Sequence, residues 1–600
     1  MEPAGSVVLP PSCAFAMHCS MKPIAPLLAA ATLSALLSAC ATPQQGARTP
    51  ALVEVGVIAI NDFHGALEPP KAAVLVPDST GKLTPVPAGG AAWLASAVDA
   101  IKAVHPNHVV VAAGDLTSAS QLSSSLHLDE PAVGVMNRIG LEFNAVGNHE
   151  FDRGWQELQR LQNGGCARNT KLEPCQHEAF KGAAYTYLSA GTFKADGTTL
   201  FPATGLKSFG KGTRKVTLGF VGLSLKDVPL LVSPSALTGL TFGDEADAIN
   251  KAIPALKAQG ADAVVVLIHQ GGKTDLAGPD SCDNLTGAIR PILDKLQPGV
   301  DLVVSGHTHW QYVCEYQPAS GGAPILLTSA GVYGKLVTDI TLTIDPAANR
   351  VTAKTARNVV VQSVAYRSAR GDVPNTVALP QFSPRADVAD YVAGYVAAAS
   401  DMIQRPVGKL SGPAAKPSDT SAAGGPLGNL IADAQLAASK DAGAEIAFTN
   451  PFGIRAPIDP APDGSVTFGQ IYMTQPFNND LVTLTLTGAQ LKDAIEDGID
   501  GADVQAIAPS AGLAYTFDLT RPPRERVVSL TLNGQPIDPA KTYRVTVVQF
   551  LADGGDGFVT FTKGTDRVMG MVDNEALQQW IAAVPVREVP QENRSVRAGM

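Results

Sequence analysis

The sequence of 600 residues lacks several features that define structural classes. It has no long run of lysine and arginine and carries a net charge of −10, which argues against a protein that holds a nucleic-acid polymer by its phosphates. Its apolar run Leu27–Ala39 has only 13 residues, too few for the roughly 20 that cross a bilayer. No internal repeat is visible at the periods of repeat proteins. The composition, 45% hydrophobic and 17% charged, instead predicts a globular protein of two to four domains.

The N-terminal segment is typical of a targeting signal rather than of a folded domain. A lysine precedes the apolar run, and small residues lead directly into Cys40, as in a bacterial lipobox. We therefore predict a signal peptide over residues 1–40, a lipidated Cys40 and a tether over residues 41–51. The alternative is an ordinary signal peptide, cleaved after Ala39 or Ala41. The lipobox predicts an exported, periplasmic or cell-surface lipoprotein that meets the membrane through its lipid anchor only.

Cysteine is scarce, and its distribution fits export. Three of the seven cysteines lie at or before Cys40. An even number remains, which in an exported chain predicts two disulfides. Short loop closure favours a bond within the closest pair and leaves the other two to pair with each other; four free or zinc-bound thiols are the alternative, although the spacing lacks a zinc-finger pattern. The expected pairs are Cys166 with Cys175 and Cys282 with Cys314.

Short apolar runs alternate with segments of helical periodicity, a pattern that predicts layered α/β domains. The runs expected to be buried strands of the first domain are Val53–Ile60, Val109–Ala113, Phe143–Val146, Val216–Val221, Ala263–Ile268, Leu302–Val304 and Ile325–Leu327. A helix expected over Arg385–Ile403 would join the domains. In chain order, the predicted segments are a first α/β domain (52–360), a linker (361–406), a second α/β domain (407–587) and a frayed tail (588–600).

Polar residues with metal-binding side chains follow nearly every strand of the first domain. Ligands of α/β proteins lie beyond the carboxyl ends of the strands, so five separate loops would converge on one place. Any one of the short patterns is weak, but the ordered set is specific: D-x-H, G-D, G-N-H-E, H and G-H-x-H. Its residues are Asp62, His64, Asp115, Asn148, His149, Glu150, His269, His307 and His309, and Asp152 follows two residues after G-N-H-E.

The side-chain types predict the chemistry of the site. Carboxylate, imidazole and amide oxygen are ligands for divalent ions such as zinc, manganese or iron. A carboxylate can bridge two ions, and two ions roughly 3.5–4 Å apart can share a hydroxide nucleophile and clamp phosphoryl oxygens. The sequence therefore predicts a hydrolase with two divalent metal ions.

This ordered set resembles the calcineurin-like metallophosphoesterase family. Longer runs resemble its 5′-nucleotidase branch, which includes periplasmic UDP-sugar hydrolases, and the resemblance covers about residues 52–585. It implies a four-layered α/β/β/α dimetal domain, a linker helix and a C-terminal α/β domain that binds substrate.

The resemblance also implies a role for each residue of the set. One metal would be held by Asp62, His64, Asp115 and His309, and the other by Asp115, Asn148, His269 and His307. Asp115 would bridge the two ions. His149 would stabilise charge on the phosphoryl group or protonate the leaving oxygen, and Asp152 would orient His149.

Three runs of the second domain resemble the substrate loops of the family. In the first run Arg455 would pair with phosphate oxygens, Asn450 would hydrogen-bond the nucleoside, and Gly453 is a further substrate-binding residue of the loop. The other runs supply two phenylalanines, Phe477 and Phe550, that would sandwich the base, and an aspartate, Asp556, that would bind ribose hydroxyls. The alternative is that both phenylalanines belong to the core. An arginine usual in the family is missing, and Lys416 is a candidate replacement.

The expected function is release of phosphate from nucleoside 5′-monophosphates outside the cytoplasm, by a monomer that requires two metals and binds no nucleic-acid polymer. Nucleotide di- and triphosphates and UDP-sugars are further candidate substrates. Two alternatives are a 2′,3′-cyclic-nucleotide phosphodiesterase/3′-nucleotidase and a sulfur-oxidation hydrolase. A third, a catalytically dead nucleotide-binding lipoprotein, conflicts with the complete ligand set.

Overall fold

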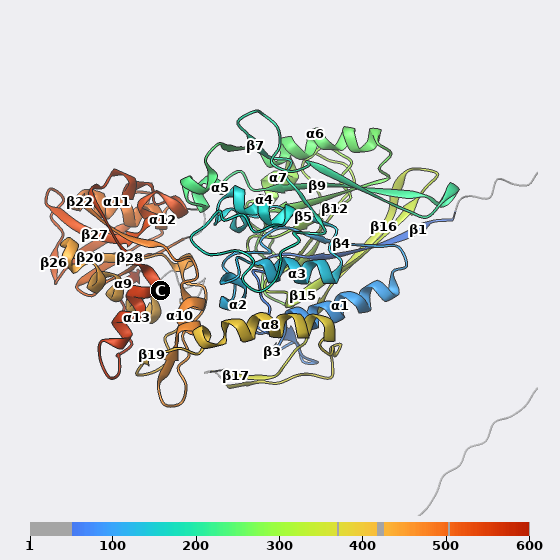
Figure 1. The fold of residues 1–600 in the computed structure, drawn as a ribbon. Coiled ribbons are helices and arrows are strands. Elements are labelled where there is room, and N and C mark those ends of the chain that lie inside the picture. The colour runs from blue at the N-terminus through green and yellow to red at the C-terminus, as the bar shows by residue number, and fades with distance from the viewer. Residues whose placement is uncertain (1–50, 369–370, 417–424, 502–503, 599–600) are drawn as a thin grey trace, which may run out of the picture. The chain divides into compact units, whose positions relative to one another are not determined.

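The structure, a computed structural model, describes residues 51–368, 371–416, 425–501 and 504–598 (Figure 1). The predicted signal peptide and Cys40 lie outside these residues. Within the described part of the chain, no helix combines the length and the apolar character that a membrane span requires.

The first domain contains two six-stranded sheets, each with a parallel centre. In the first sheet β1, β4, β5 and β6 run parallel, and two antiparallel strands extend it at one edge. Its order is β16 (Arg350–Val360), β15 (Leu336–Asp345), β1 (Val53–Ile60), β4 (His108–Ala112), β5 (Phe143–Ala145) and β6 (Thr186–Leu188). The order of the second sheet is β13 (Gln311–Tyr316), β14 (Ile325–Ala330), β12 (Leu302–Ser305), β11 (Ala263–His269), β9 (Val216–Ser224) and β8 (Thr204–Phe209).

These strands are continuous apolar runs because both of their faces are buried. In β1, Val55 and Val57 pack into the core between the two sheets. Ile58 and Ile60 belong instead to the core beneath the outer helices. Because side chains alternate between the two faces of a strand, the side chains of β1 contribute to both cores.

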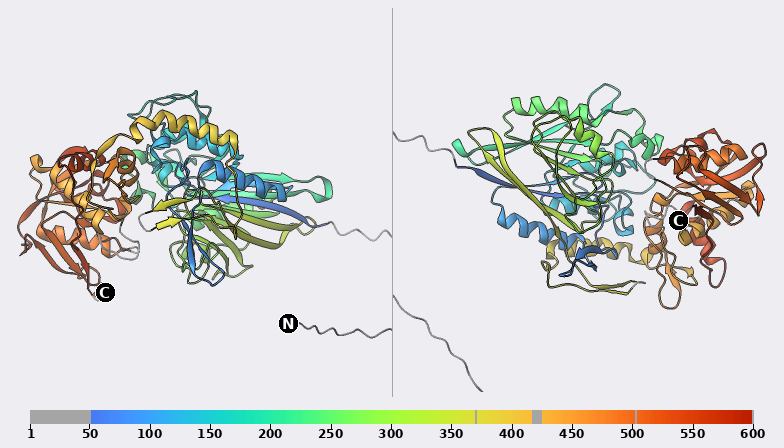
Figure 2. Two further views of the ribbon diagram at one scale, coloured as in Figure 1. Left: turned by 90° about the horizontal axis from the view of Figure 1, so that it is seen from below. Right: turned by 180° about the vertical axis from the view of Figure 1, so that it is seen from behind.

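Helices cover the outer face of each sheet, so the first domain has four layers, α/β/β/α (Figures 1 and 2). Over the first sheet lie α1 (Ala91–Val104), α3 (Glu130–Ile139) and α4 (Trp155–Asn163). Over the second sheet lie α6 (Glu245–Ala258) and α7 (Ile289–Asp294). The expected layered α/β architecture is confirmed, and all seven predicted strands are present within a few residues of their expected bounds.

Helix α8 (Ala386–Ile403) follows the first domain and packs Val388 and Val392 into the core beneath α1 and α3. After it begins a second α/β domain with a core of its own. Its helices are α9 (Gly425–Ala438), α10 (Phe468–Thr474), α11 (Gly488–Ile499), α12 (Gln549–Ala552) and α13 (Asp573–Ala582). Its larger sheet has the order β23 (Ala508–Pro509), β20 (Ile446–Thr449), β27 (Thr542–Val548), β22 (Asp480–Thr487) and β28 (Thr565–Val572).

The C-terminal residues are not the frayed tail that the sequence predicts. Strand β29 (Ser595–Arg597) runs parallel to β24 (Leu513–Phe517) at the edge of a four-stranded sheet. Arg594, just before it, is buried and forms ion pairs with Asp433 and Glu592. The prediction of a frayed tail was wrong because Arg594 is buried and paired with two carboxylates rather than solvated.

Candidate dimetal centre

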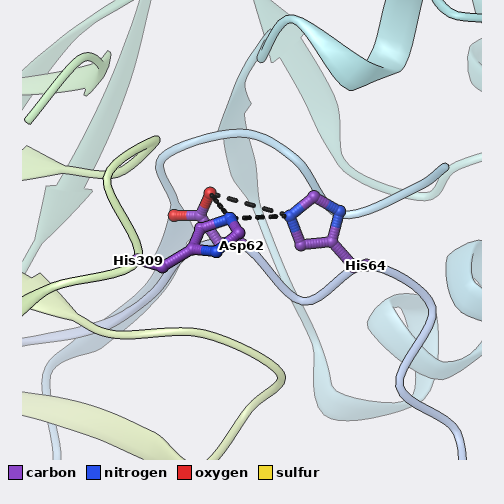
Figure 3. Close-up of side chains that lie close together, drawn as sticks. All are labelled: Asp62, His64 and His309. Atoms are coloured by element: carbon purple, nitrogen blue, oxygen red, sulfur yellow. Dashed lines mark hydrogen bonds and ion pairs between the residues drawn. The ribbon is translucent and has the colours of Figure 1, made fainter. Parts of the chain in front are cut away.

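The five polar loops of the first domain converge at the carboxyl ends of their strands. Loops after β1, β4, β11 and β12 bring together two groups of side chains whose ligand atoms lie within 4.8 Å of one another in each group. The first group is Asp62, His64 and His309 (Figure 3), and the second is Asp115, His269 and His307. The loop after β5 adds Asn148. Every predicted metal ligand therefore lies in one cluster.

Backbone conformation brings these side chains inward. Five of the six residues in the two groups have left-handed backbone, with φ between 47° and 72°. Non-glycine residues rarely adopt this region, which costs of order 1 kcal/mol or more per residue. The five residues are Asp62, His64, Asp115, His307 and His309. Such strain persists only where surrounding contacts hold the backbone in place, and here it is concentrated on the candidate ligands.

In the first group, two imidazoles face each other beside a carboxylate. Nε2 of His64 lies 3.2 Å from Nε2 of His309, and both nitrogens lie within 4 Å of Asp62 Oδ1. Nδ1 of His64 lies 2.9 Å from the carbonyl oxygen of Ser118, which can only accept, so Nδ1 donates and the lone pair of Nε2 faces the cluster. Burial lowers the pKa of His64 to about 3. A lone pair of His64 next to a carboxylate and a second imidazole fits a cation.

The second group is built around Asp115. Its Oδ2 lies 2.9 Å from Nε2 of His269, and Nδ1 of His269 is held by the carbonyl of Ala113 at 2.7 Å. The amide oxygen of Asn148 lies 3.1 Å from both His269 and His307. Burial opposes the charge on Asp115, but His269 and His149 outweigh it and hold its pKa well below the ordinary value. Asp115 also approaches Nε2 of His64 at 3.8 Å, so it lies between the two groups, as a bridging ligand must.

Glu150 is a functional residue whose role the sequence did not reveal. Its buried carboxylate accepts hydrogen bonds from the backbone N–H groups of Asp115, Leu116 and Gly147, at 2.7–2.8 Å. It thereby joins the loops after β4 and β5. A Cβ atom on Gly147 would lie 2.1 Å from Asp115 Oδ1, so this glycine is required by the close approach. The motif G-N-H-E includes this glutamate, but from the sequence its carboxylate is as well suited to binding a metal as to binding backbone amides.

His149 and Asp152 form a hydrogen-bonded pair beside the cluster. Nδ1 of His149 lies 2.8 Å from Asp152 Oδ2, and the His149 backbone N–H donates to Asp115 Oδ1 at 2.9 Å. Burial disfavours the imidazolium, but Asp152 and Asp115 outweigh it and raise the pKa of His149. This ring therefore favours its protonated form beside the two ligand groups, as a general acid requires.

Residues of the second domain lie next to this pair. The ring of Phe477 stacks on His149, with centroids 5.6 Å apart and planes inclined by 13°. The guanidinium of Arg455 lies 5.9 Å from the Phe477 ring, and its Nη2 is buried without a hydrogen-bond partner in the described part of the chain. The positive charge of Arg455 also helps to lower the pKa of His309. An unpaired guanidinium nitrogen in this position fits an anionic group of a substrate.

The other predicted substrate residues form a second cluster nearby. Asn450 Nδ2 donates to Asp556 Oδ2 at 2.6 Å, and burial raises the pKa of Asp556 to about 6. Any Cβ on Gly453 would meet Asn450 Oδ1 at 2.6 Å. Phe550 is half-buried and lies against Gly555, so it is partly a core residue. The role of Lys416 remains a prediction.

Two disulfides stabilise loops around the first domain. One joins Cys166 to Cys175, and the other joins Cys282 to Cys314. These are the pairs expected from loop length. The alternative of four free or zinc-bound thiols does not describe this structure.

Comparison with known proteins agrees with this architecture. Residues 56–311 match the calcineurin-like phosphoesterase family, and residues 406–563 match the 5′-nucleotidase C-terminal domain. A solved structure, the 5′-nucleotidase precursor of Thermus thermophilus, is 25% identical and superposes with a TM-score of 0.73, covering 91% of this chain and 100% of that one.

The matched region covers very different shares of two related proteins. An Acinetobacter calcoaceticus protein from the pqq-V 5′ region is 49% identical over 161 residues, which is 26% of this chain and 79% of that protein. Endonuclease YhcR of Bacillus subtilis is 28% identical over 88% of this chain, which spans only 40% of that relative. The chain belongs to the proteins that join a calcineurin-like phosphoesterase domain to a 5′-nucleotidase C-terminal domain. It is therefore a metal-dependent hydrolase.

Proposed function

We propose that the protein is a 5′-nucleotidase that releases phosphate from nucleoside 5′-monophosphates outside the cytoplasm. The observation that carries the proposal is the buried, unpartnered Nη2 of Arg455 beside the His149–Asp152 pair and the two ligand groups. A phosphate there would give this nitrogen an acceptor that the described part of the chain does not supply.

The residues divide the work between chemistry and recognition. Asp62, His64, Asp115 and His309 would hold one divalent ion, and Asp115, Asn148, His269 and His307 the other. When bound, the ions supply Lewis acidity, which neutralises phosphoryl charge and acidifies water. His149, kept protonated by Asp152, donates to the phosphoryl or leaving oxygen.

Recognition of the nucleoside belongs to the second domain. Phe477 and Phe550 offer aromatic faces to a base, and the Asp556 carboxylate, oriented by Asn450, accepts from ribose hydroxyls. Stacking tolerates every base, so we expect broad base specificity, and we include di- and triphosphates and UDP-sugars among the candidate substrates. The two disulfides and the N-terminal signal pattern support an exported, lipid-anchored protein, which we propose acts as a monomer.

A phosphate-release screen tests this function. Purified protein is stripped with a chelator and reloaded with zinc, manganese or iron, then supplied with nucleoside 5′-monophosphates, 2′,3′-cyclic nucleotides, UDP-glucose and p-nitrophenyl phosphate. Metal-dependent release that is fastest from 5′-monophosphates is expected. Faster turnover of the cyclic nucleotides would favour the phosphodiesterase alternative, and no release with any metal would overturn the proposal.

A further inference from the structure

Arg153 lies directly after the His149–Asp152 pair but belongs to neither the ligand set nor the substrate loops. Its side chain is 19% exposed and is paired with Asp129, whose side chain is 0% exposed. Nη1 donates to Asp129 Oδ2, and Nη2 donates to Ser125 Oγ at 2.8 Å. A buried guanidinium with two separate sets of partners is a connection between loops, not a solvated surface charge.

Asp129 uses its carboxylate to hold the loop after β4. Oδ2 accepts from the backbone N–H of Ser118 at 3.0 Å, and Oδ1 accepts from Ser124 Oγ at 2.7 Å. Burial opposes ionisation of this carboxyl, but Arg153 outweighs it and lowers the pKa of Asp129. Asp129 itself has left-handed backbone, with φ of 60°, so its orientation is maintained at a conformational cost.

Ser118 transmits this connection to the candidate metal ligand His64. The carbonyl of Ser118 accepts from Nδ1 of His64 at 2.9 Å, which directs Nε2 into the cluster. Ser118 also has left-handed backbone, with φ of 63°. Its N–H is held by Asp129, and its Oγ lies 3.3 Å from Arg153 Nη1. The ion pair therefore determines where the carbonyl that orients His64 points.

Ser125 carries the connection in the other direction, to the second domain. Its Oγ lies 2.5 Å from the hydroxyl of Tyr472, and Leu122 packs against Tyr472 in the same contact. The Tyr472 hydroxyl in turn lies 3.4 Å from Nδ2 of Asn478, the residue after Phe477. Phe477 stacks on His149. The chain of contacts thus begins next to His149 and returns to it.

We propose that Arg153 and Asp129 are a positioning pair that aligns three parts of the site: the ligand His64, the His149–Asp152 loop and, through Ser125 and Tyr472, the Phe477 loop. The inference deepens the proposed nucleotidase function and rests on it for the nucleotide readout. The pair touches no reacting atom. It acts by reducing the number of arrangements that the reacting groups adopt before substrate binds.

Two conservative variants and their combination test the pair. Tyr472→Phe removes one hydroxyl and keeps the ring, and we expect it to raise KM for AMP about five-fold, the scale of one hydrogen bond, with kcat within two-fold. Arg153→Lys keeps the positive charge but loses the several donors of the guanidinium. We therefore expect the same rise in KM for AMP, and a fall in kcat of about ten-fold for both AMP and p-nitrophenyl phosphate. In the double variant, KM for AMP should be no higher than in Arg153→Lys alone, because both changes break one connection.

A matched control separates positioning from general loss of stability. Tyr515→Phe removes another buried tyrosine hydroxyl of the second domain, one that donates to the carbonyl of Ile507 at 2.7 Å. It should leave both kinetic constants at wild-type values. Kinetic effects of this control as large as those of Tyr472→Phe would overturn the proposal, as would multiplicative effects of Arg153→Lys and Tyr472→Phe on KM.

Two readouts do not depend on nucleotide hydrolysis. Turnover of p-nitrophenyl phosphate should fall in Arg153→Lys whichever natural substrate the protein uses. Asp129→Asn should lose bound zinc to a competing chelator faster than wild type, because the carbonyl that orients His64 is released. If wild-type protein ignores AMP but both effects appear, the nucleotidase proposal fails and the positioning pair stands. If AMP is hydrolysed and neither effect appears, the pair is only structural.

Discussion

The imidazole of His149 and the ring of Phe477 lie stacked, 5.6 Å apart and nearly parallel, although they belong to different domains. His149 precedes α4 in the first domain, and Phe477 follows α10 in the second. The acid–base group and a candidate base-stacking residue therefore share a contact. A substitution of Phe477 would disturb both chemistry and recognition. Phe550 has no ring contact with His149 among the described residues, so its substitution tests recognition without disturbing His149.

Asp115 should be the most sensitive of the metal ligands. It lies 2.9 Å from His269 and 3.8 Å from His64, so its loss disturbs both groups at once. We expect Asp115→Ala to abolish phosphate release and to lower the metal content measured by elemental analysis after dialysis. Full activity in a metal-depleted Asp115→Ala protein would show that the two groups are not a catalytic centre.

His149 should contribute to chemistry without holding metal. We expect His149→Ala to reduce kcat by roughly 10²–10⁴-fold, the usual scale of a positioned acid–base group, while the bound metal stays near the wild-type amount. Turnover and metal content are measured on the same sample. A variant that loses its metal would instead identify His149 as a ligand.

Phe550 should affect KM more than kcat. Stacking on a nucleobase contributes about 1–3 kcal/mol and is present in both the ground state and the transition state. We therefore expect Phe550→Ala to raise KM for nucleoside monophosphates about ten-fold or more. Turnover of p-nitrophenyl phosphate, which has no nucleoside, is the control. Equal losses on both substrates would show that Phe550 acts mainly through its packing on the core around Gly555.

Asp556 should make stability depend on pH. Burial raises its pKa from 3.8 to about 6, so between about pH 4 and pH 6 the folded protein keeps a proton that the unfolded chain has lost. The free energy of unfolding then falls as pH rises through this window, and the loss is complete above about pH 6. Asp556→Asn keeps an acceptor for Asn450 and suits the left-handed backbone of this position.

Thermal unfolding at two pH values measures this effect. Relative to wild type, Asp556→Asn should raise Tm at pH 7.5 and leave it almost unchanged at pH 4, because other titrating groups are common to both proteins and cancel. An equal shift at both pH values would mean that the substitution acts by packing rather than through the charge.

The sequence by itself determined the layered α/β fold, the bounds of α8 to within one residue and the loops that carry Asp62, Asp115 and His307. It could do so because burial constrains which residue types occupy each position of a strand. A strand with both faces covered must be continuously apolar, and polar residues that follow it must lie at the edge of the sheet. The loops were therefore predictable one by one.

The tertiary structure alone decided which atoms meet. No signature in residue type or spacing marks the left-handed backbone of the ligands, the ion pair of Arg153 with Asp129 or the pairing of β29 with β24. The motif G-N-H-E includes Glu150 but does not show that its carboxylate binds backbone amides. Each of these features depends on segments far apart in the chain, up to about 80 residues for the two paired strands. The periodicity of a sequence indicates whether a side chain is buried, but not which residue it contacts. That contact forms only when the layers pack, because every buried polar group must then find a hydrogen-bond partner.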